Sequence, residues 1–340
     1  MDLKKKQTDA NLKPGNRTVP GRTIPVPHKD ISERAKEMIA APYNVFINWN
    51  LNPPTKEDWR KIVTKVSESS APAVNKLIKD LGLKVEQLQI GGVKCYRLTP
   101  GSIPENHRKQ LVIVAHGGGY VYAPGIGSVR EAAMFAAFGG YTTISVDYSL
   151  SSETPFPGAI EDMIDVWQTI LTEYDPRSIA MTGTSAGGGL IMATILKIKE
   201  LGLAMPAAIA PSSPWADLTE TGDSYKTNEW LDNILVSYSG YLGLAAKLYA
   251  NGNDLSHPLL SPINGDFEGF PPTILTSGTR DLFLSNTVRS HRKLRRASVP
   301  AQLQIYEGIS HSQLSFDPDL PETREAYREI AAFFDQYLIS

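Results

Sequence analysis

Apolar runs of strand length alternate with segments of helical periodicity through most of the chain after residue 110. Residues 111–115 form an unbroken apolar run, typical of a strand buried on both faces of a parallel sheet. Further strands are expected at 142–146, 178–182, 207–210, 273–277 and 301–306, and helices at 128–138, 158–174, 185–201, 284–297 and 321–338. This alternation predicts an α/β protein with a mostly parallel central sheet flanked by helices.

The chain before residue 84 has a different pattern. Residues 11–27 are rich in Pro and Gly and are expected to form an irregular arm. Helices are expected at 31–41, which Ser32 can cap and Pro42 stops, and then separately at 56–69 and 72–83. Two strands, at 85–90 and 93–98, are expected to form a hairpin around a Gly-Gly turn.

The alternation of strand and helix breaks once, between residues 211 and 270. This stretch is rich in Tyr and Trp, and its middle, 231–249, has helical character. We interpret it as an insertion that packs with the N-terminal helices into a helical cap over the sheet. The expected organisation is an N-terminal arm with cap helices (1–83), the first part of the core (84–210), the cap insertion (211–270) and the second part of the core (271–340).

Composition and charge exclude several classes of protein. The chain has 340 residues with 41% apolar content, and its net charge of −2 gives no reason to expect a nucleic-acid or membrane partner. The basic residues of 284–297 are interpreted as a solvated helix face. The one cysteine, Cys95, cannot form an intramolecular disulfide. No signal peptide and no apolar run of membrane-spanning length is found, so a cytoplasmic protein is expected.

The strongest chemical signal is the sequence Gly183-Thr184-Ser185-Ala186-Gly187, which fits G-x-S-x-G. It lies where the strand at 178–182 ends and the next helix begins. In that context the serine occupies a sharp turn that exposes its hydroxyl, and the glycines avoid clashes with neighbouring backbone. Ser185 is therefore the candidate nucleophile.

A glycine run follows directly on the strand at 111–115, in the sequence His116-Gly117-Gly118-Gly119. Acyl transfer builds negative charge on the substrate oxygen, and backbone N–H donors aimed at that oxygen stabilise it. The expected oxyanion donors are the N–H groups of Gly117, Gly118 and Ala186. His116 is expected to shape the loop rather than to carry a proton.

A serine hydroxyl needs a base, and the order nucleophile, acid, base requires that base to follow Ser185. Of the three later histidines, His291 lies mid-helix among basic residues and His257 lies within the insertion. His311 alone lies in a loop just after the last strand, where parallel strands end at the site. His311 is therefore the candidate base.

The acid should follow an earlier strand of the sheet. Asp281 lies in the loop after the strand at 273–277, where it would hold the imidazole and offset the charge that forms on it. Asp254 and Asp266 are alternatives, but neither follows a sheet strand. A simple helix-capping role for Asp281 is also plausible locally.

These motifs resemble those of the bacterial hormone-sensitive-lipase-like esterases, in their GTSAG branch. The resemblance covers about residues 30–338. It also extends to other short segments, namely Asp147-Tyr148, Pro155-Phe156-Pro157, Glu161-Asp162 and Ser213-Pro214-Trp215. The sequence departs from the family pattern after Tyr148, after Asp281 and after His311. These departures leave the three candidate catalytic residues in place but do not carry substrate preference over.

The resemblance implies the α/β-hydrolase fold with a helical cap. It implies a carboxylesterase that hydrolyses short-chain acyl esters through an acyl-enzyme on Ser185, without cofactor or metal. The aromatic residues near the site suggest a confined apolar pocket, whose candidate walls are Tyr120, Tyr122, Trp215 and Phe283. In some members of the family two chains pair through an edge strand, here 301–306, so a homodimer is one expectation for the oligomeric state.

Other functions on the same fold stay open at this point. An amidase, a lactonase or a natural-product deacetylase would use the same three residues, and the sequence does not separate them. A ligand-binding homologue without turnover should lack a base, whereas His311 is present. Dehalogenases and epoxide hydrolases of this fold need a carboxylate nucleophile, and Ser185 argues against them.

Overall fold

The fold is organised around one eight-stranded sheet with the strand order β1-β2-β4-β3-β5-β6-β7-β8. The computed structural model describes residues 21, 23–43, 52–53 and 55–339. The first two strands form an antiparallel hairpin, and β2 also pairs antiparallel with β4. From β4 to β8 the neighbouring strands are parallel. The mostly parallel sheet predicted from the sequence is confirmed.

The strands are short and lie close to the positions expected from the apolar runs. Their bounds are β1 Lys84–Ile90, β2 Val93–Thr99, β3 Leu111–Ala115, β4 Thr142–Val146, β5 Ile179–Thr184, β6 Ala208–Ser212, β7 Thr273–Gly278 and β8 Ala301–Tyr306. The helices are α2 Glu33–Ala40, α3 Lys56–Asp80, α4 Val129–Gly139, α5 Gly158–Ile170, α6 Ala186–Glu200, α7 Ser224–Thr227, α8 Tyr241–Ala250, α9 Leu284–Arg296 and α10 Pro321–Phe334.

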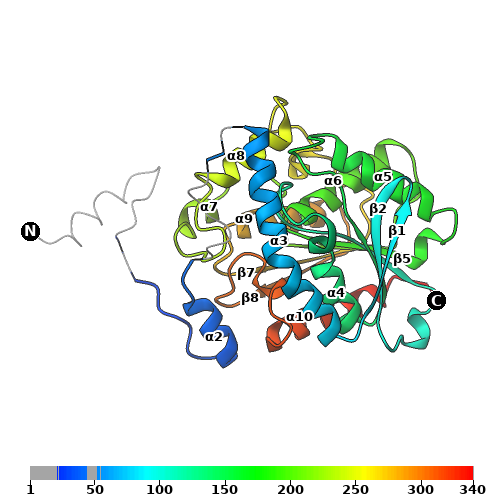
Figure 1. Cartoon of the computed structure of the whole chain (residues 1–340), viewed down its shortest axis with the longest axis horizontal. Helices are drawn as coiled ribbons and strands as arrows, with labels where there is room; N and C mark the ends of the chain where they lie inside the picture. The colour runs from blue at the N-terminus through cyan, green and yellow to red at the C-terminus, as the bar shows by residue number, and fades with distance from the viewer. Residues whose placement is uncertain (1–20, 22, 44–51, 54, 340) are drawn as a thin grey trace, which may run out of the picture.

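Helices cover both faces of the sheet (Figure 1). On β3, Leu111, Ile113 and Ala115 contribute to the core beneath α5, α6 and α9. The alternate residues Val112 and Val114 contribute to the core on the opposite face, together with α4 and α10. Successive side chains of a strand point to opposite faces, so burial of both faces explains why this strand is apolar throughout.

The two N-terminal helices expected at 56–69 and 72–83 are one continuous helix, α3, with Pro72 inside it. The prediction of a break at Pro72 was wrong because it considered the cost of the proline without the burial of the helix on either side of it. A proline inside a helix costs about 3 kcal/mol or more. Burying an apolar side chain gains roughly 1.5–3 kcal/mol. Trp59 and Val63 are buried in one core and Val74 and Leu77 in the other, so both halves of the helix are held.

The helical character expected at 231–249 is only partly correct. The structure forms the short helix α7 at Ser224–Thr227 and the helix α8 at Tyr241–Ala250, with turns between them. Gly240 precedes α8 with a φ of 93°, a conformation that residues other than glycine rarely adopt, so the helix begins after it. The turn region 228–240 lies beside the loops that follow β7 and β8 and is hydrogen-bonded to them.

Long α3 lies across the molecule against α4 and the short 3-10 helix η2 at Gly125–Ser128 (Figure 1). Helix α2, capped by Ser32 as expected, packs through Ala35 and Ile39 against residues that follow β8. Among the helices within the described ranges, none combines the length and the apolar character needed to cross a membrane.

Replacing Pro72 by Ala should stabilise the protein. The new backbone N–H can donate to the Glu68 carbonyl, and alanine lacks the ring that clashes with that carbonyl, so we expect a gain of up to about 3 kcal/mol. Thermal unfolding would measure it. Pro176→Ala is the control, because Pro176 begins a 3-10 helix, where its ring is compatible, and should bring no gain. An unfolding midpoint of Pro72→Ala at or below the wild-type value would contradict this account.

Candidate active site

Ser185 sits in the turn between β5 and α6 with a φ of 59° and a ψ of −122°, an unusual conformation for a residue with a side chain. The turn is held because the Ser185 N–H donates to the Ser212 carbonyl at 2.9 Å. The flanking glycines leave no room for larger residues. A Cβ on Gly183 would lie 2.6 Å from the Ala115 carbonyl oxygen, and one on Gly187 would lie 2.0 Å from it. The close approach of β3 therefore requires glycine at both positions.

His311 and Asp281 lie on the loops that follow β8 and β7, and they are in direct contact. His311 Nδ1 lies 2.9 Å from Asp281 Oδ1, and both side chains are buried. The same carboxylate accepts hydrogen bonds from the Ser277 hydroxyl at 2.7 Å and the Phe283 N–H at 2.8 Å. Burial opposes the charge on Asp281, but His311 and these donors outweigh it and hold the pKa of Asp281 below its usual range.

His311 Nε2 is buried and has no hydrogen-bond partner among the described residues. Ser185 and His311 both line one cavity. The two side chains do not form a hydrogen bond with each other in the described structure. Contacts of this kind are often long until substrate is bound, so the geometry is compatible with proton transfer.

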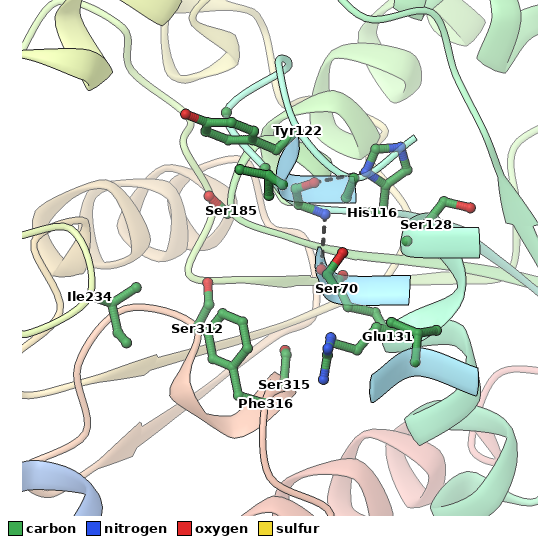
Figure 2. A pocket seen from close by; sticks show the side chains of 18 of the residues that line it. Ser70, His116, Tyr122, Ser128, Glu131, Ser185, Ile234, Ser312, Ser315 and Phe316 are labelled. Atoms are coloured by element: carbon green, nitrogen blue, oxygen red, sulfur yellow. Dashed lines mark hydrogen bonds between the residues drawn. The ribbon is translucent and has the colours of Figure 1, made fainter. Parts of the chain in front are cut away.

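The N–H of Gly117 is already engaged in a hydrogen bond within the protein, which corrects the expected set of oxyanion donors by removing Gly117 from it. It donates to Glu131 Oε1 at 2.9 Å (Figure 2). The other oxygen of Glu131 accepts the Thr184 N–H at 3.1 Å. One half-buried carboxylate thus ties the glycine loop to the turn that carries Ser185. Within the described ranges, no hydrogen bond is made by the N–H of Gly118, Gly119 or Ala186.

Burial raises the pKa of Glu131 to about 7, although the two backbone donors favour its charged form. No motif or spacing in the sequence distinguishes this residue. It lies in the first turn of α4, where an acidic residue is ordinary, and only the fold brings it between the two loops.

His116 is buried and shapes its loop, as expected. Its ring stacks on Tyr148 with 4.1 Å between ring centroids, and the Tyr148 hydroxyl donates to the His116 carbonyl at 2.8 Å. Burial lowers the pKa of His116, so the neutral ring is favoured.

A cavity of about 380 Å³ lies over Ser185. Figure 2 shows Tyr122 above the centre of the view, Ile234 at the left, Glu131 toward the right, and Ser312, Ser315 and Phe316 below. The wall comes from α3, the glycine loop, the start of α4, the insertion and the loop after His311. Besides the residues already named, its lining includes Val66, Ser69, Ser70, Ala73, Val74, Ser128, Arg130, Leu235 and Tyr241.

Of the four aromatic residues expected to form the wall, only Tyr122 does. Tyr120, Trp215 and Phe283 do not line the cavity and are fully buried. Tyr120 stacks on Tyr249 with 3.7 Å between centroids, and Trp215 stacks on Phe283 at 5.5 Å. These three rings form the packing behind the site, and Phe283 supports His311 edge-on at 4.8 Å. They belong to the core because another aromatic ring covers the face of each: Tyr249 covers Tyr120, and Trp215 and Phe283 cover each other.

The alternative acids and bases lie elsewhere. Asp266 pairs with Lys199 on the surface, and Asp254 accepts hydrogen bonds from Ser256 in an exposed turn. His257 packs against Phe156, and His291 lies on α9. None of these lines the cavity. Over the described part of the chain, no three His, Cys, Asp or Glu side chains form a group that could hold a metal ion.

A second acidic residue beside the site was also missed. Asp232, from the insertion, is fully buried next to the Asp281 and His311 loops. Burial, followed by the negative charge of Asp281, raises the pKa of Asp232 to about 6, against the opposing effect of His311. No periodicity or spacing in the sequence distinguishes it from the other acidic residues of the insertion.

Comparison with known proteins gives consistent matches. A family model described as alpha/beta hydrolase fold matches residues 112–315. An esterase of Acinetobacter venetianus is 30% identical over 229 residues, which is 66% of this chain and 74% of that protein. The crystal structure of the esterase E25 superposes with a TM-score of 0.91 at 38% identity, covering 95% of this chain and 99% of that one. An esterase from the bacterial hormone-sensitive lipase family gives 0.74 at 28% identity, covering 90% and 97%.

The stability of the protein should fall as the pH rises through about 7, in part because of Glu131. Its folded pKa of about 7 lies above the ordinary value of 4.5, so folding favours the protonated carboxyl. That contribution is complete below pH 4.5 and is lost as the pH rises through 7, on the order of 3 kcal/mol. Glu131→Gln should therefore show a smaller drop in thermal midpoint between pH 5 and pH 8.

The control is Glu161→Gln, which alters an exposed glutamate on α5 and should keep the wild-type pH dependence. Asp232 contributes in the same direction, so part of the dependence should survive in Glu131→Gln. An unaltered drop in that variant would contradict the assignment of a near-neutral pKa to Glu131.

Proposed function

The chain belongs to the alpha/beta hydrolase fold family, among its hormone-sensitive-lipase-like esterases, and on that premise we propose that it is a serine carboxylesterase with Ser185 as nucleophile. One observation on this chain supports the proposal independently of its family. His311 is held by Asp281 at 2.9 Å, and its other ring nitrogen is buried without a partner at the cavity that Ser185 also lines.

In the first step Ser185 Oγ attacks the ester carbonyl while His311 Nε2 accepts the hydroxyl proton. The imidazolium that forms is stabilised by Asp281, which fixes Nδ1 as the protonated nitrogen through its hydrogen bond. The phenyl ring of Phe283 restrains the imidazole edge-on. His311 then protonates the leaving alcohol, and an acyl group remains on Ser185.

The oxyanion of the tetrahedral intermediate needs N–H donors that are not already engaged. Gly117 does not meet this condition, because its N–H donates to Glu131. We assign the donors to Gly118, Gly119 and Ala186. Gly118 and Gly119 line the cavity, and Ala186 begins α6 directly after the nucleophile, where the helix N-terminus also favours negative charge.

Deacylation reverses the roles. A water molecule attacks the acyl carbonyl while His311 takes its proton. The second tetrahedral intermediate then collapses as His311 returns that proton to Ser185 Oγ, which breaks the acyl bond and releases the carboxylic acid. Every step uses side chains and backbone groups of this chain, and the scheme calls on no cofactor.

A cap formed by α2, α3 and the insertion is part of the same proposal. Asn233 Nδ2 donates to the carbonyls of Met38 and Ala41, and α3 supplies one wall of the cavity. Pockets that bind drug-sized ligands measure roughly 300–1,000 Å³. The cavity of about 380 Å³ lies at the low end of that range, which supports small substrates with short acyl chains.

Ser185→Ala should abolish hydrolysis of p-nitrophenyl butyrate, with a loss of at least about 10⁴-fold in kcat, because no other group forms the acyl-enzyme. His311→Asn should fall to a similar level. Ser102→Ala, at an exposed position, and His291→Asn, on α9, are the matched controls and should retain wild-type rates. Turnover that survives Ser185→Ala would remove the assignment of the nucleophile.

The acyl-length profile of the wild-type enzyme tests the size of the site. In a p-nitrophenyl series from acetate to palmitate, kcat/KM should be highest for short chains and fall steeply for long ones, because the cavity cannot enclose them. The parallel rates on anilides and lactones would separate an esterase from an amidase or a lactonase. A maximum at palmitate would contradict the confined pocket.

A further inference from the structure

Asp232 is a buried carboxylate in contact with both catalytic loops, and the mechanism above gives it no role. It lies in the turn region of the insertion between α7 and α8, it is fully buried, and it does not line the cavity. A buried charged group is costly unless it is well hydrogen-bonded, so its partners indicate what it does.

The two oxygens of Asp232 serve two different sets of donors. Oδ1 accepts the N–H groups of Ile234 and Leu235 at 2.8 and 3.1 Å, which closes the local turn. Oδ2 accepts the N–H of Leu282 at 2.8 Å and that of His311 at 3.3 Å. Leu282 directly follows Asp281, so Oδ2 holds the backbone at the acid and at the base simultaneously.

The next residue fixes the same segment from the other side. Asn233 Oδ1 accepts a hydrogen bond from Gln313 Nε2 at 2.8 Å, and the Asn233 N–H donates to the Ser310 hydroxyl at 3.3 Å. Its Nδ2 donates to the Met38 and Ala41 carbonyls at the end of α2. Residues 232 and 233 therefore join the insertion, α2 and the loop of the base at one point.

We propose that Asp232 is a positioning residue of the esterase, whose Oδ2 sets the relative placement of the Asp281 and His311 loops. This inference rests on the roles proposed for those two residues. The pairing of Asp281 and His311 spans 30 residues and two separate loops, so neither loop fixes the other through local structure. The two loops meet directly where the Arg280 N–H donates to the Ile309 carbonyl at 3.1 Å and the Gly308 N–H donates to the Thr279 hydroxyl at 2.8 Å. Asp232 Oδ2 adds one acceptor that both loops share beside the acid and the base, and it links their geometry to the cap.

The variant Asp232→Asn tests the proposal while keeping the size of the side chain. An amide has one acceptor oxygen, so if that oxygen stays with Ile234 and Leu235, the NH₂ group faces the N–H groups of Leu282 and His311. We expect kcat for p-nitrophenyl butyrate to fall about 10- to 100-fold, because small displacements of catalytic groups carry losses of that size. KM should stay within about twofold of wild type.

Asp217→Asn is the matched control. Asp217 is also a buried aspartate of the insertion, but its carboxylate binds Thr219 and Arg289, away from the catalytic loops. This variant should lower the thermal midpoint without changing kcat. An equal loss of kcat in both variants would mean that loosening the insertion explains the effect, and it would overturn the proposal.

Two further results would also overturn it. One is wild-type kcat in a folded Asp232→Asn protein. The other is a raised KM with unchanged kcat, which would assign Asp232 to the cavity wall through Ile234 and Leu235.

If Asp232→Asn does not fold, Asp232→Glu replaces it, since the carboxylate is kept but displaced by one methylene. An unchanged kcat in that variant would count against positioning. A wild-type enzyme inactive on every ester would instead refute the proposed function.

Discussion

The proposed active site depends on how the loop backbones at the carboxyl ends of the parallel strands are held. Each proposed catalytic group lies on such a loop, and each loop exposes N–H groups that the sheet no longer satisfies. Two carboxylates, half-buried Glu131 and fully buried Asp232, accept these groups in pairs. Glu131 joins the glycine loop to the turn of Ser185, and Asp232 joins the loops of Asp281 and His311. Buried N–H groups left without acceptors would each cost roughly 1–3 kcal/mol, so these carboxylates restrict the loops to one arrangement.

The sheet, and the placement of Ser185, Asp281 and His311 at one edge of it, could be predicted from the sequence because they depend on local signals. An unbroken apolar run is sufficient to mark β3 as a strand buried on both faces. Ser185 is marked by its glycines and by the strand that precedes it, and His311 and Asp281 by their places after later strands. Parallel strands bring their carboxyl ends to one edge of a sheet, so a position in the sequence becomes a position in space without further information.

The rest of the site depends on side-chain contacts between distant segments, which no local pattern encodes. Whether an aromatic ring lines the cavity or packs behind it depends on which partner covers its face. Tyr249 covers Tyr120, a residue 129 positions away, whereas Tyr122, two residues on, reaches the cavity. The same applies to the oxyanion donors. The motif identifies the glycine loop, but only the position of Glu131 on α4 shows that the N–H of Gly117 is occupied.

Two carboxylates around one imidazole differ in their pKa because they contact different groups. Asp281 touches the ring of His311, and that contact with its other donors outweighs burial, so its pKa is lowered and it stays charged. Asp232 accepts hydrogen bonds from neutral backbone N–H groups, so burial, followed by the charge of Asp281, raises its pKa to about 6. In the proposed mechanism His311 gains a proton during acylation, and this positive charge favours the ionised form of both carboxylates. On these proposed roles, Asp232 supports the imidazolium through its charge as well as through the backbone N–H of His311, without a hydrogen bond to the ring.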